Sequence, residues 1–215
     1  MRAEARHQLK QDKFSRTTLE VAGQTVDWTV EHKSKIIIGA VIALVVAGAV
    51  FGGWYYINGQ DQKASADLTK AVRAMEAPIR PADALAQPDL QSYTSVKERA
   101  TDAHKQFQAV VDKYPHTHNG DVARYFLGLT AADMGDYTSA QKELNTVASY
   151  HNPDLASLAK LALASVYRQQ GQNKQAIDIY KALADKPTAM VSKPAAQLQL
   201  AETLMADKQP LEAKG

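Results

Sequence analysis

The sequence predicts an all-α protein, in which a single N-terminal transmembrane helix is followed by an α-solenoid of antiparallel helix pairs. Three observations carry this prediction: an uncharged apolar run near the N-terminus, a long region rich in helix-forming residues, and a sequence pattern that recurs along that region. Of the 215 residues, 45% are apolar. A chain of this composition can bury a core, which argues against wholesale disorder.

The apolar run covers residues 36–57 and contains no charged side chain. As a helix it would span about 33 Å, close to the ~30 Å hydrocarbon core of a bilayer. Trp54, Tyr55 and Tyr56 stand at its C-terminal end, where interfacial aromatic residues belong. A buried soluble helix and a signal peptide cleaved after Ala47-Gly48-Ala49 are the alternatives, but the stretch before the run is long for a signal peptide. We therefore predict an uncleaved anchor that contacts the lipid bilayer through residues 36–57.

Charges beside this run indicate its orientation. Lys33 and Lys35 adjoin its N-terminal end, whereas the first charge after it is Asp61. Within 20 residues on either side the numbers of Lys and Arg are equal, but long C-terminal domains are translocated largely regardless of charge. The sequence thus predicts that residues 1–35 form a basic cytoplasmic tail. It also predicts that the region after the apolar run lies on the other side of the membrane.

Gly48 and Gly52 form a GxxxG pair inside the apolar run. Small residues at this spacing let two membrane helices approach closely, which would allow a homodimer. The alternative reading is that glycine is simply common in membrane helices.

The region after the anchor is rich in Ala, Leu, Gln and Lys, and Pro or Gly interrupts it at intervals that favour antiparallel helix pairs. We expect residues 58–96 to form a first helix and a Pro-rich connection. Residues 97–215 are then expected to hold the repeats. The pairing partner of the helix expected at 97–114 is open at this stage: it is either a helix at about 60–77 or a degenerate helix inside 84–97, where Pro88 would be awkward.

The repeating pattern is anchored by three alanines, at 140, 176 and 213, which lie 36 and then 37 residues apart. Upstream of them, Leu127-Gly128 aligns with Leu163-Ala164 and Leu200-Ala201. This pattern resembles the tetratricopeptide (TPR) repeat. Small residues at these positions are expected where the two helices of one repeat touch. Gly135 and Gly171 are expected to close the turns in a left-handed conformation. The third repeat is incomplete at residue 215, so we expect either a fragment or an edge that another chain covers, and favour the fragment.

The residues that could support chemistry are sparse. There is no Cys, which excludes thiol catalysis and Cys-ligated metals. No phosphate-binding glycine motif or nucleophile elbow occurs. His116 and His118 could bind a metal but more plausibly belong to a surface loop. A formal net charge of +2 argues against nucleic-acid binding. We therefore expect no enzyme, no cofactor and no metal site.

A repeat stack of this kind offers a concave face for binding a polypeptide. In the repeat register the first helices of the pairs would present there Tyr125, Leu129, Asp133, Leu161, Ser165, Arg168, Gln169, Leu198 and Glu202. The alternative for each apolar member is ordinary packing between helices.

The whole chain resembles the bacterial ancillary subunit of the SecYEG translocon, a family whose TPR domain is related to that of cell-division coordinator proteins. The resemblance rests on the tail residues Leu9-Lys10-Gln11-Asp12-Lys13-Phe14 and Trp28 to His32, together with the order of tail, anchor and repeats. It implies a single-pass protein of the bacterial inner membrane with a cytoplasmic N-terminus. The periplasmic domain would act as a chaperone-like accessory factor that contacts translocon subunits and translocating or periplasmic polypeptides. The alternative function is a scaffold for envelope assembly or cell division, and no catalytic residue is implied.

Overall fold

The computed structural model describes residues 33–81 and 91–208. Within these ranges the chain is α-helical, apart from a lone parallel bridge between Ile79 and Tyr93. The helices are α2 (Lys33–Glu76), α3 (Val96–Lys113), α4 (His118–Asp133), α5 (Tyr137–Ala148), α6 (Pro153–Gln169), α7 (Asn173–Asp185) and α8 (Lys193–Lys208). The all-α prediction is confirmed. Three expectations lie largely or wholly outside the described residues: the cytoplasmic tail, a helix near Pro88 and the second helix of the third repeat.

The chain divides into two units, the first ending at Tyr56 and the second beginning at Ile57. Helix α2 contributes to both, so the apolar run and the following helix, which we expected as separate elements, form one continuous helix. No proline interrupts Asn58-Gly59-Gln60. In the first unit α2 is long and apolar enough to cross a membrane, and none of that stretch is buried. Phe51 and Trp54 are among its exposed side chains.

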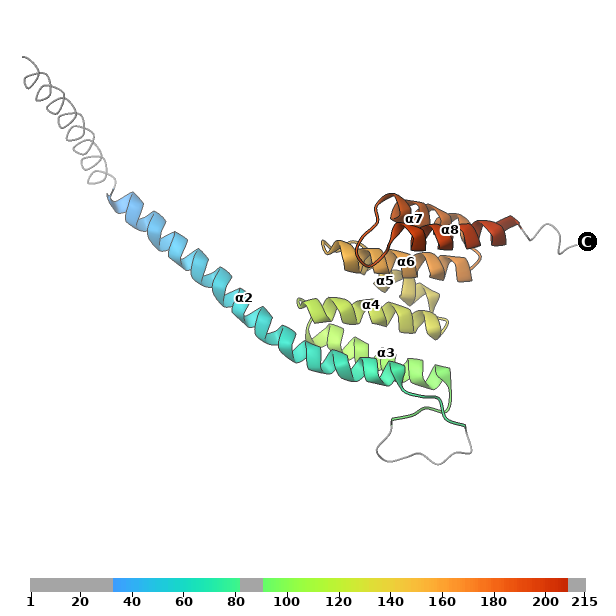
Figure 1. Ribbon diagram of the computed structural model, residues 1–215. Coiled ribbons are helices and arrows are strands. Elements are labelled where there is room, and N and C mark those ends of the chain that lie inside the picture. Colours follow the sequence, from blue (N-terminus) through green and yellow to red (C-terminus); the bar gives the residue numbers. More distant parts are fainter. Residues whose placement is uncertain (1–32, 82–90, 209–215) are drawn as a thin grey trace, which may run out of the picture. The chain divides into compact units, whose positions relative to one another are not determined.

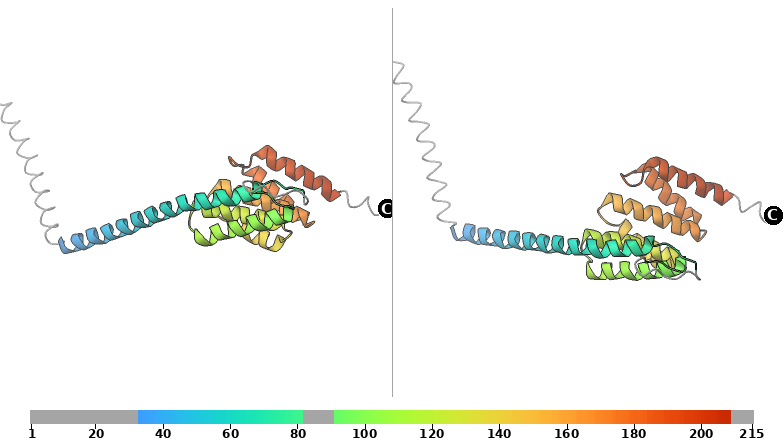
Figure 2. Two further views of the ribbon diagram at one scale, coloured as in Figure 1. Left: turned by 90° about the horizontal axis from the view of Figure 1, so that it is seen from below. Right: turned by 60° about the horizontal axis from the view of Figure 1, so that its bottom comes forward.

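The second unit is a succession of antiparallel helices, each packed against its neighbours in sequence. Figure 1 and the two views of Figure 2 show the same order from α3 in green to α8 in red. Helices α4, α6 and α8 run in one direction, and α3, α5 and α7 run in the other (Figure 1). This is the predicted solenoid of helix pairs.

Local sequence explains why the helices begin where they do. Ser95, Thr117, Asp136 and Asn152 precede α3, α4, α5 and α6, and the side chain of each accepts a hydrogen bond from a backbone N–H in the first turn. Such caps satisfy amides that have no partner inside the helix.

The turns after α4 and α6 depend on glycine. Gly135 has φ 83° and Gly171 has φ 71°, as the repeat alignment predicted. L-residues rarely adopt this conformation. In both turns the third residue beyond the helix donates a backbone hydrogen bond to a helix carbonyl: the Asp136 N–H donates to the carbonyl of Ala131 at 2.9 Å. These bonds satisfy helix carbonyls and let the chain reverse within a few residues.

The aligned small residues lie where the helices of one repeat touch. A Cβ atom on Gly128 would lie 2.7 Å from Cγ of Leu144, so the α4–α5 contact has no space for a side chain there. In the next repeat Ala164 of α6 is fully buried in one cluster with Ala176 and Tyr180 of α7. The same contact is thus made by Gly and Leu in one repeat and by Ala and Tyr in the next.

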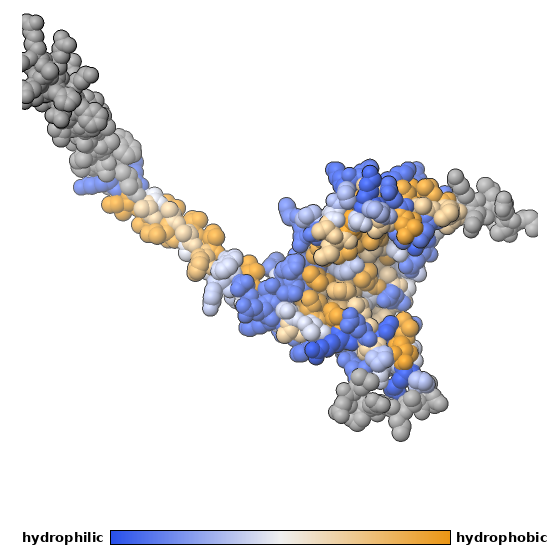
Figure 3. Space-filling view, viewed as in Figure 1, coloured by the Kyte–Doolittle hydropathy of each residue, from blue (hydrophilic) through white to orange (hydrophobic). Residues whose placement is uncertain are grey.

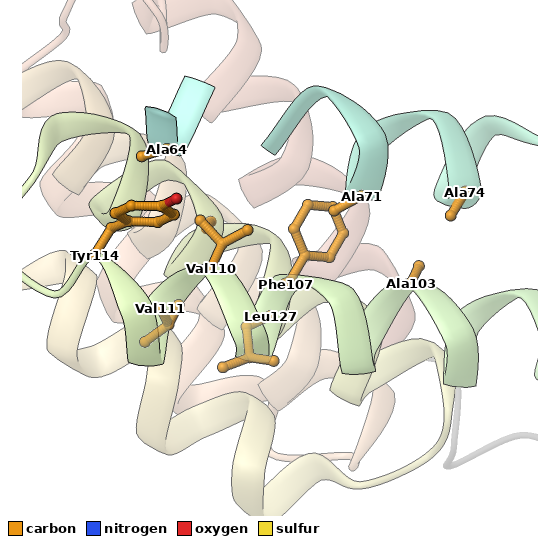
Figure 4. Close-up of a cluster of buried hydrophobic side chains, with 10 residues drawn as sticks. Ala64, Ala71, Ala74, Ala103, Phe107, Val110, Val111, Tyr114 and Leu127 are labelled. Atoms are coloured by element: carbon orange, nitrogen blue, oxygen red, sulfur yellow. The ribbon is translucent and has the colours of Figure 1, made fainter. Parts of the chain in front are cut away.

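The C-terminal part of α2 packs against α3. Figure 4 shows Phe107 of α3 pointing toward Ala71 of α2, with Ala103 facing Ala74. Small side chains on α2 let this helix come close enough to enclose the Phe107 ring. The ring also stacks on Phe126 of α4, with centroids 5.2 Å apart. Within the described residues, this segment of α2 occupies the pairing position that the sequence left open.

Candidate binding groove

A groove runs across α4, α6 and α8 in the second unit and encloses about 510 Å³. Figure 3 shows apolar side chains gathered in the middle of this face, over α4 and α6. The lining is contributed by Tyr125, Leu129, Ala132, Asp133, Leu158, Leu161, Ala162, Ser165, Val166, Gln169, Tyr180, Ala195, Leu198 and Gln199.

Leucines from three helices form the apolar part of the groove. Leu129 of α4 and Leu161 of α6 are half-buried, and Leu198 of α8 is 59% exposed. These side chains share one face because every second helix of the stack runs in the same direction. A contiguous apolar surface of this kind marks an interaction site more often than isolated exposed leucines do.

Asp133 is the last residue of α4 and lies on the groove wall. Desolvation by the surrounding protein raises the pKa of its carboxyl group, and the positive charge of Arg99 acts in the opposite direction. No hydrogen bond or ion pair to this carboxylate is found within the described part of the chain. Asp133 is nevertheless exposed, so the groove holds an acidic group that contacts solvent and has no hydrogen-bond or ion-pair partner in the described residues.

Two tyrosines contribute to the groove from different depths. Tyr125 of α4 is half-buried, and burial raises the pKa of its phenol. Tyr180 of α7 lies beneath the floor and is fully buried, and its hydroxyl has no hydrogen-bond partner in the described residues. Burial also raises the pKa of Tyr180, so both phenols stay protonated near neutral pH.

The structure brings together most of the residues expected on the concave face. Tyr125, Leu129, Asp133, Ser165 and Gln169 line the groove, as do Leu161 and Leu198. Arg168 and Glu202 lie outside its lining and pair with each other, with Nη1 and Oε2 3.3 Å apart.

The repeat register missed several lining residues. Leu158 lies one helical turn before Leu161, so extending the α6 register toward the N-terminus would have found it. Tyr180 belongs to the second helix of its pair, and its place beneath the groove follows from the small side chains around it. The repeat alignment matches Tyr180 with Leu144 as a large packed residue, but it did not indicate that Tyr180 would lie beneath the groove.

The described residues contain no group of three or more His, Cys, Asp or Glu side chains that could hold a metal ion. His116 lies in the turn after α3, and His118 is the first residue of α4. Between them Thr117 caps α4 by accepting a hydrogen bond from the Gly120 N–H at 2.9 Å. This stretch therefore has an evident role as a helix start. The groove offers contact surface and isolated polar groups, which suit recognition of a polypeptide.

Comparison with known protein families gives one match in support of this fold. The tetratricopeptide repeat-like domain family matches residues 26–193. Searches of curated proteins and of solved structures gave no match.

Proposed function

Because the chain belongs to the tetratricopeptide repeat-like domain family, a class of protein-interaction modules, we propose that it is a membrane-anchored module whose groove holds a segment of a partner polypeptide. The observation that carries the proposal is the row of leucines that α4, α6 and α8 expose on one face. A partner that covers this row removes apolar surface from water, at about 25 cal/mol per Å². The polar groups beside the leucines supply direction and selectivity.

The second part of the proposal concerns location. The anchor lies in the bacterial inner membrane, with residues 1–35 in the cytoplasm and the second unit in the periplasm. Lys33 and Lys35 beside the apolar run support this orientation, since positive residues favour the cytoplasmic side.

The absence of Cys makes the orientation easy to test. A single cysteine introduced by Ser139→Cys should react with a membrane-impermeant thiol reagent in cells with a permeabilised outer membrane. One introduced by Ser15→Cys should react only after the inner membrane is opened. The reverse pattern of labelling would place the second unit in the cytoplasm.

The third part concerns partners. We propose that the groove receives polypeptides near the SecYEG translocon, as an accessory or chaperone-like factor. The resemblance of the tail residues to the ancillary translocon subunit supports this, together with the order of tail, anchor and repeats. A scaffold for envelope assembly or cell division would use the same groove with other partners.

A photoreactive amino acid at Leu161, in the full-length protein and in living cells, tests the groove and its partners together. The matched control carries it at Lys181, an exposed residue of α7 that does not line the groove. We expect adducts with translocon subunits or secretory chains from position 161 and few from position 181. Adducts with division proteins would favour the scaffold. Equal adducts from both positions would contradict binding in the groove.

A further inference from the structure

The charged groups of the groove are unevenly distributed. Asp133 is the one carboxylate among the residues that line it, and the lining includes no Lys, Arg or His. Three carboxylates at helix–helix contacts in the described residues are paired with a basic side chain: Asp67 with Lys113, Glu202 with Arg168, and Glu143, which lies 2.7 Å from Nη1 of Arg124. Asp133 is exposed and makes no such pair in the described part of the chain; the positive charge of Arg99 acts on it without a hydrogen bond or ion pair.

The C-terminal ends of two helices add partial negative charge to the groove beside Asp133. Asp133 is the C-terminal residue of α4, whose last turn has no basic side chain. Gln169, another lining residue, is the C-terminal residue of α6, and the two helices run in the same direction (Figure 1). The C-terminus of a helix carries roughly half a negative charge. The basic residue in the last turn of α6, Arg168, is engaged by Glu202.

We propose that the groove selects polypeptide segments in which a lysine or arginine stands among apolar residues, and that Asp133 pairs with this basic side chain while the leucines bind its apolar neighbours. The inference rests on the function proposed above and specifies the class of segment bound.

Three physical effects favour such a segment over the alternatives. A wholly apolar segment would bury Asp133 further without supplying a partner for it. An acidic segment would meet a carboxylate and two helix C-termini of the same sign. A lysine or arginine neutralises the carboxylate, and its aliphatic stem covers apolar surface on the way to it.

Two synthetic peptides test the proposal with the full-length protein in zwitterionic lipid nanodiscs. Both are fifteen-residue fluorescent peptides of leucine, alanine and serine, and they differ at one central position, lysine or glutamine. Fluorescence anisotropy measures the dissociation constants, and empty nanodiscs correct for binding to lipid. We expect the lysine peptide to bind about fivefold more tightly, the upper range for a partly exposed ion pair. The preference should weaken as ionic strength rises.

Two charge-removing variants locate the preference. In Asp133→Asn the ratio between the two peptides should fall to about one, because the carboxylate is gone and the shape is kept. Asp178→Asn removes an equal charge from an exposed site on α7 outside the groove, and should keep the fivefold ratio. A preference unchanged in Asp133→Asn, or lost equally in both variants, overturns the inference.

A third variant separates this inference from the proposed function. Leu198→Ser alters a lining side chain that is 59% exposed, so folding should be maintained. It should weaken both peptides alike. If both peptides bind, respond to Leu198→Ser and show no lysine preference, the groove is a binding site and the selectivity is wrong. If neither peptide binds, or neither responds to Leu198→Ser, the proposed function fails and the inference fails with it.

Discussion

Two carboxylates, one at a helix contact and one in the groove, differ in their hydrogen bonding and in the direction of their pKa shifts. Asp67 lies between α2 and α3, where it accepts hydrogen bonds from Nζ of Lys113 at 3.1 Å and from the Tyr114 hydroxyl at 3.0 Å. These bonds, that from Lys113 foremost, lower the pKa of Asp67. Asp133 lies in the groove without such bonds, and desolvation raises its pKa. Asp67 is thus hydrogen-bonded at a helix contact, whereas Asp133 in the groove is exposed and has no partner in the described residues.

Buried hydroxyl groups also differ between the helix contacts, where they have a partner, and the region beneath the groove. Thr130 lies buried between α3 and α4 and is 3.1 Å from Nδ1 of His104. Ser157 of α6 is 2.7 Å from the hydroxyl of Thr188. Tyr180, beneath the groove, has no partner for its hydroxyl in the described residues. A buried hydroxyl without a hydrogen bond lowers stability, so the Tyr180 hydroxyl destabilises the fold beneath the groove.

Truncating one apolar side chain in each region should give the largest difference. Phe107→Ala removes a fully buried ring from the α2–α3 contact and should lower the free energy of unfolding by about 3–5 kcal/mol. Leu198→Ala in the groove should change it by no more than about 0.5 kcal/mol. Urea unfolding of the full-length protein in mild detergent, followed by circular dichroism, measures both. Equal losses would show that the groove leucines belong to the core.

Filling the closest helix contact tests the packing itself. In Gly128→Ala the new methyl group meets Leu144, and overpacking of this kind costs about 1–3 kcal/mol. Alanine recovers about 1 kcal/mol through its helix propensity, so a net loss of about 1 kcal/mol is expected. Combining the change with Leu144→Val should be less damaging than the sum of the single losses, since the two sites share one space. Additive losses in the same urea assay would mean that these residues do not compete for it.

Removing the unpartnered hydroxyl should stabilise the protein. Tyr180→Phe keeps the ring and deletes a buried group that lacks a hydrogen bond, so the free energy of unfolding should rise by about 1 kcal/mol. Tyr114→Phe is the matched control, because it deletes a hydroxyl that donates to Asp67 and should lower stability. A loss in both variants would indicate that Tyr180 has a partner in solution.

The two carboxylates should respond to pH with opposite signs. The folded pKa of Asp67 is lowered, so its stabilising effect is present above the unfolded value near 3.8 and fades as pH falls through the folded value. The folded pKa of Asp133 is raised, so its charge destabilises the fold at neutral pH. That penalty disappears once pH falls below about 3.8, where the group is protonated in both states.

Asparagine substitutions measure this contrast. At pH 7 Asp67→Asn should lower the free energy of unfolding and Asp133→Asn should raise it, each by less than about 1 kcal/mol because both sites are partly solvated. In urea titrations the Asp133 difference should shrink as pH falls toward 3.8, and the Asp67 difference should shrink only below 3.8. The same sign for both variants at pH 7 would remove the distinction between the two regions.

Much of the fold could be predicted because repetition makes its pattern visible. Gly128 and Ala164 recur because two helices touch there and only a small residue fits. Gly135 and Gly171 recur because the turn needs a left-handed conformation that other residues rarely adopt. The partner of α3 was harder to identify, because α2 contacts it mainly through alanines such as Ala71 and Ala74. Alanine is equally common on exposed helix faces.

The groove was predictable in outline for the same reason. Tyr125, Asp133 and Ser165 follow from the repeat register alone. The pairing of Arg168 with Glu202 depends on how two helices from different repeats approach each other, which no local pattern records. The unpartnered state of Tyr180 likewise depends on every group around it.

The repeats also differ at one equivalent position along the stack. Leu129, Ser165 and Glu202 each follow the small residue of their helix, so the same place changes from apolar to polar to charged from α4 to α8. A solenoid of identical units would offer a guest chain the same contacts after a shift by one repeat. The change from Leu129 to Ser165 within the groove, and to Glu202 beside it, makes positions that differ by one repeat unequal in energy, so a guest chain is held in one register.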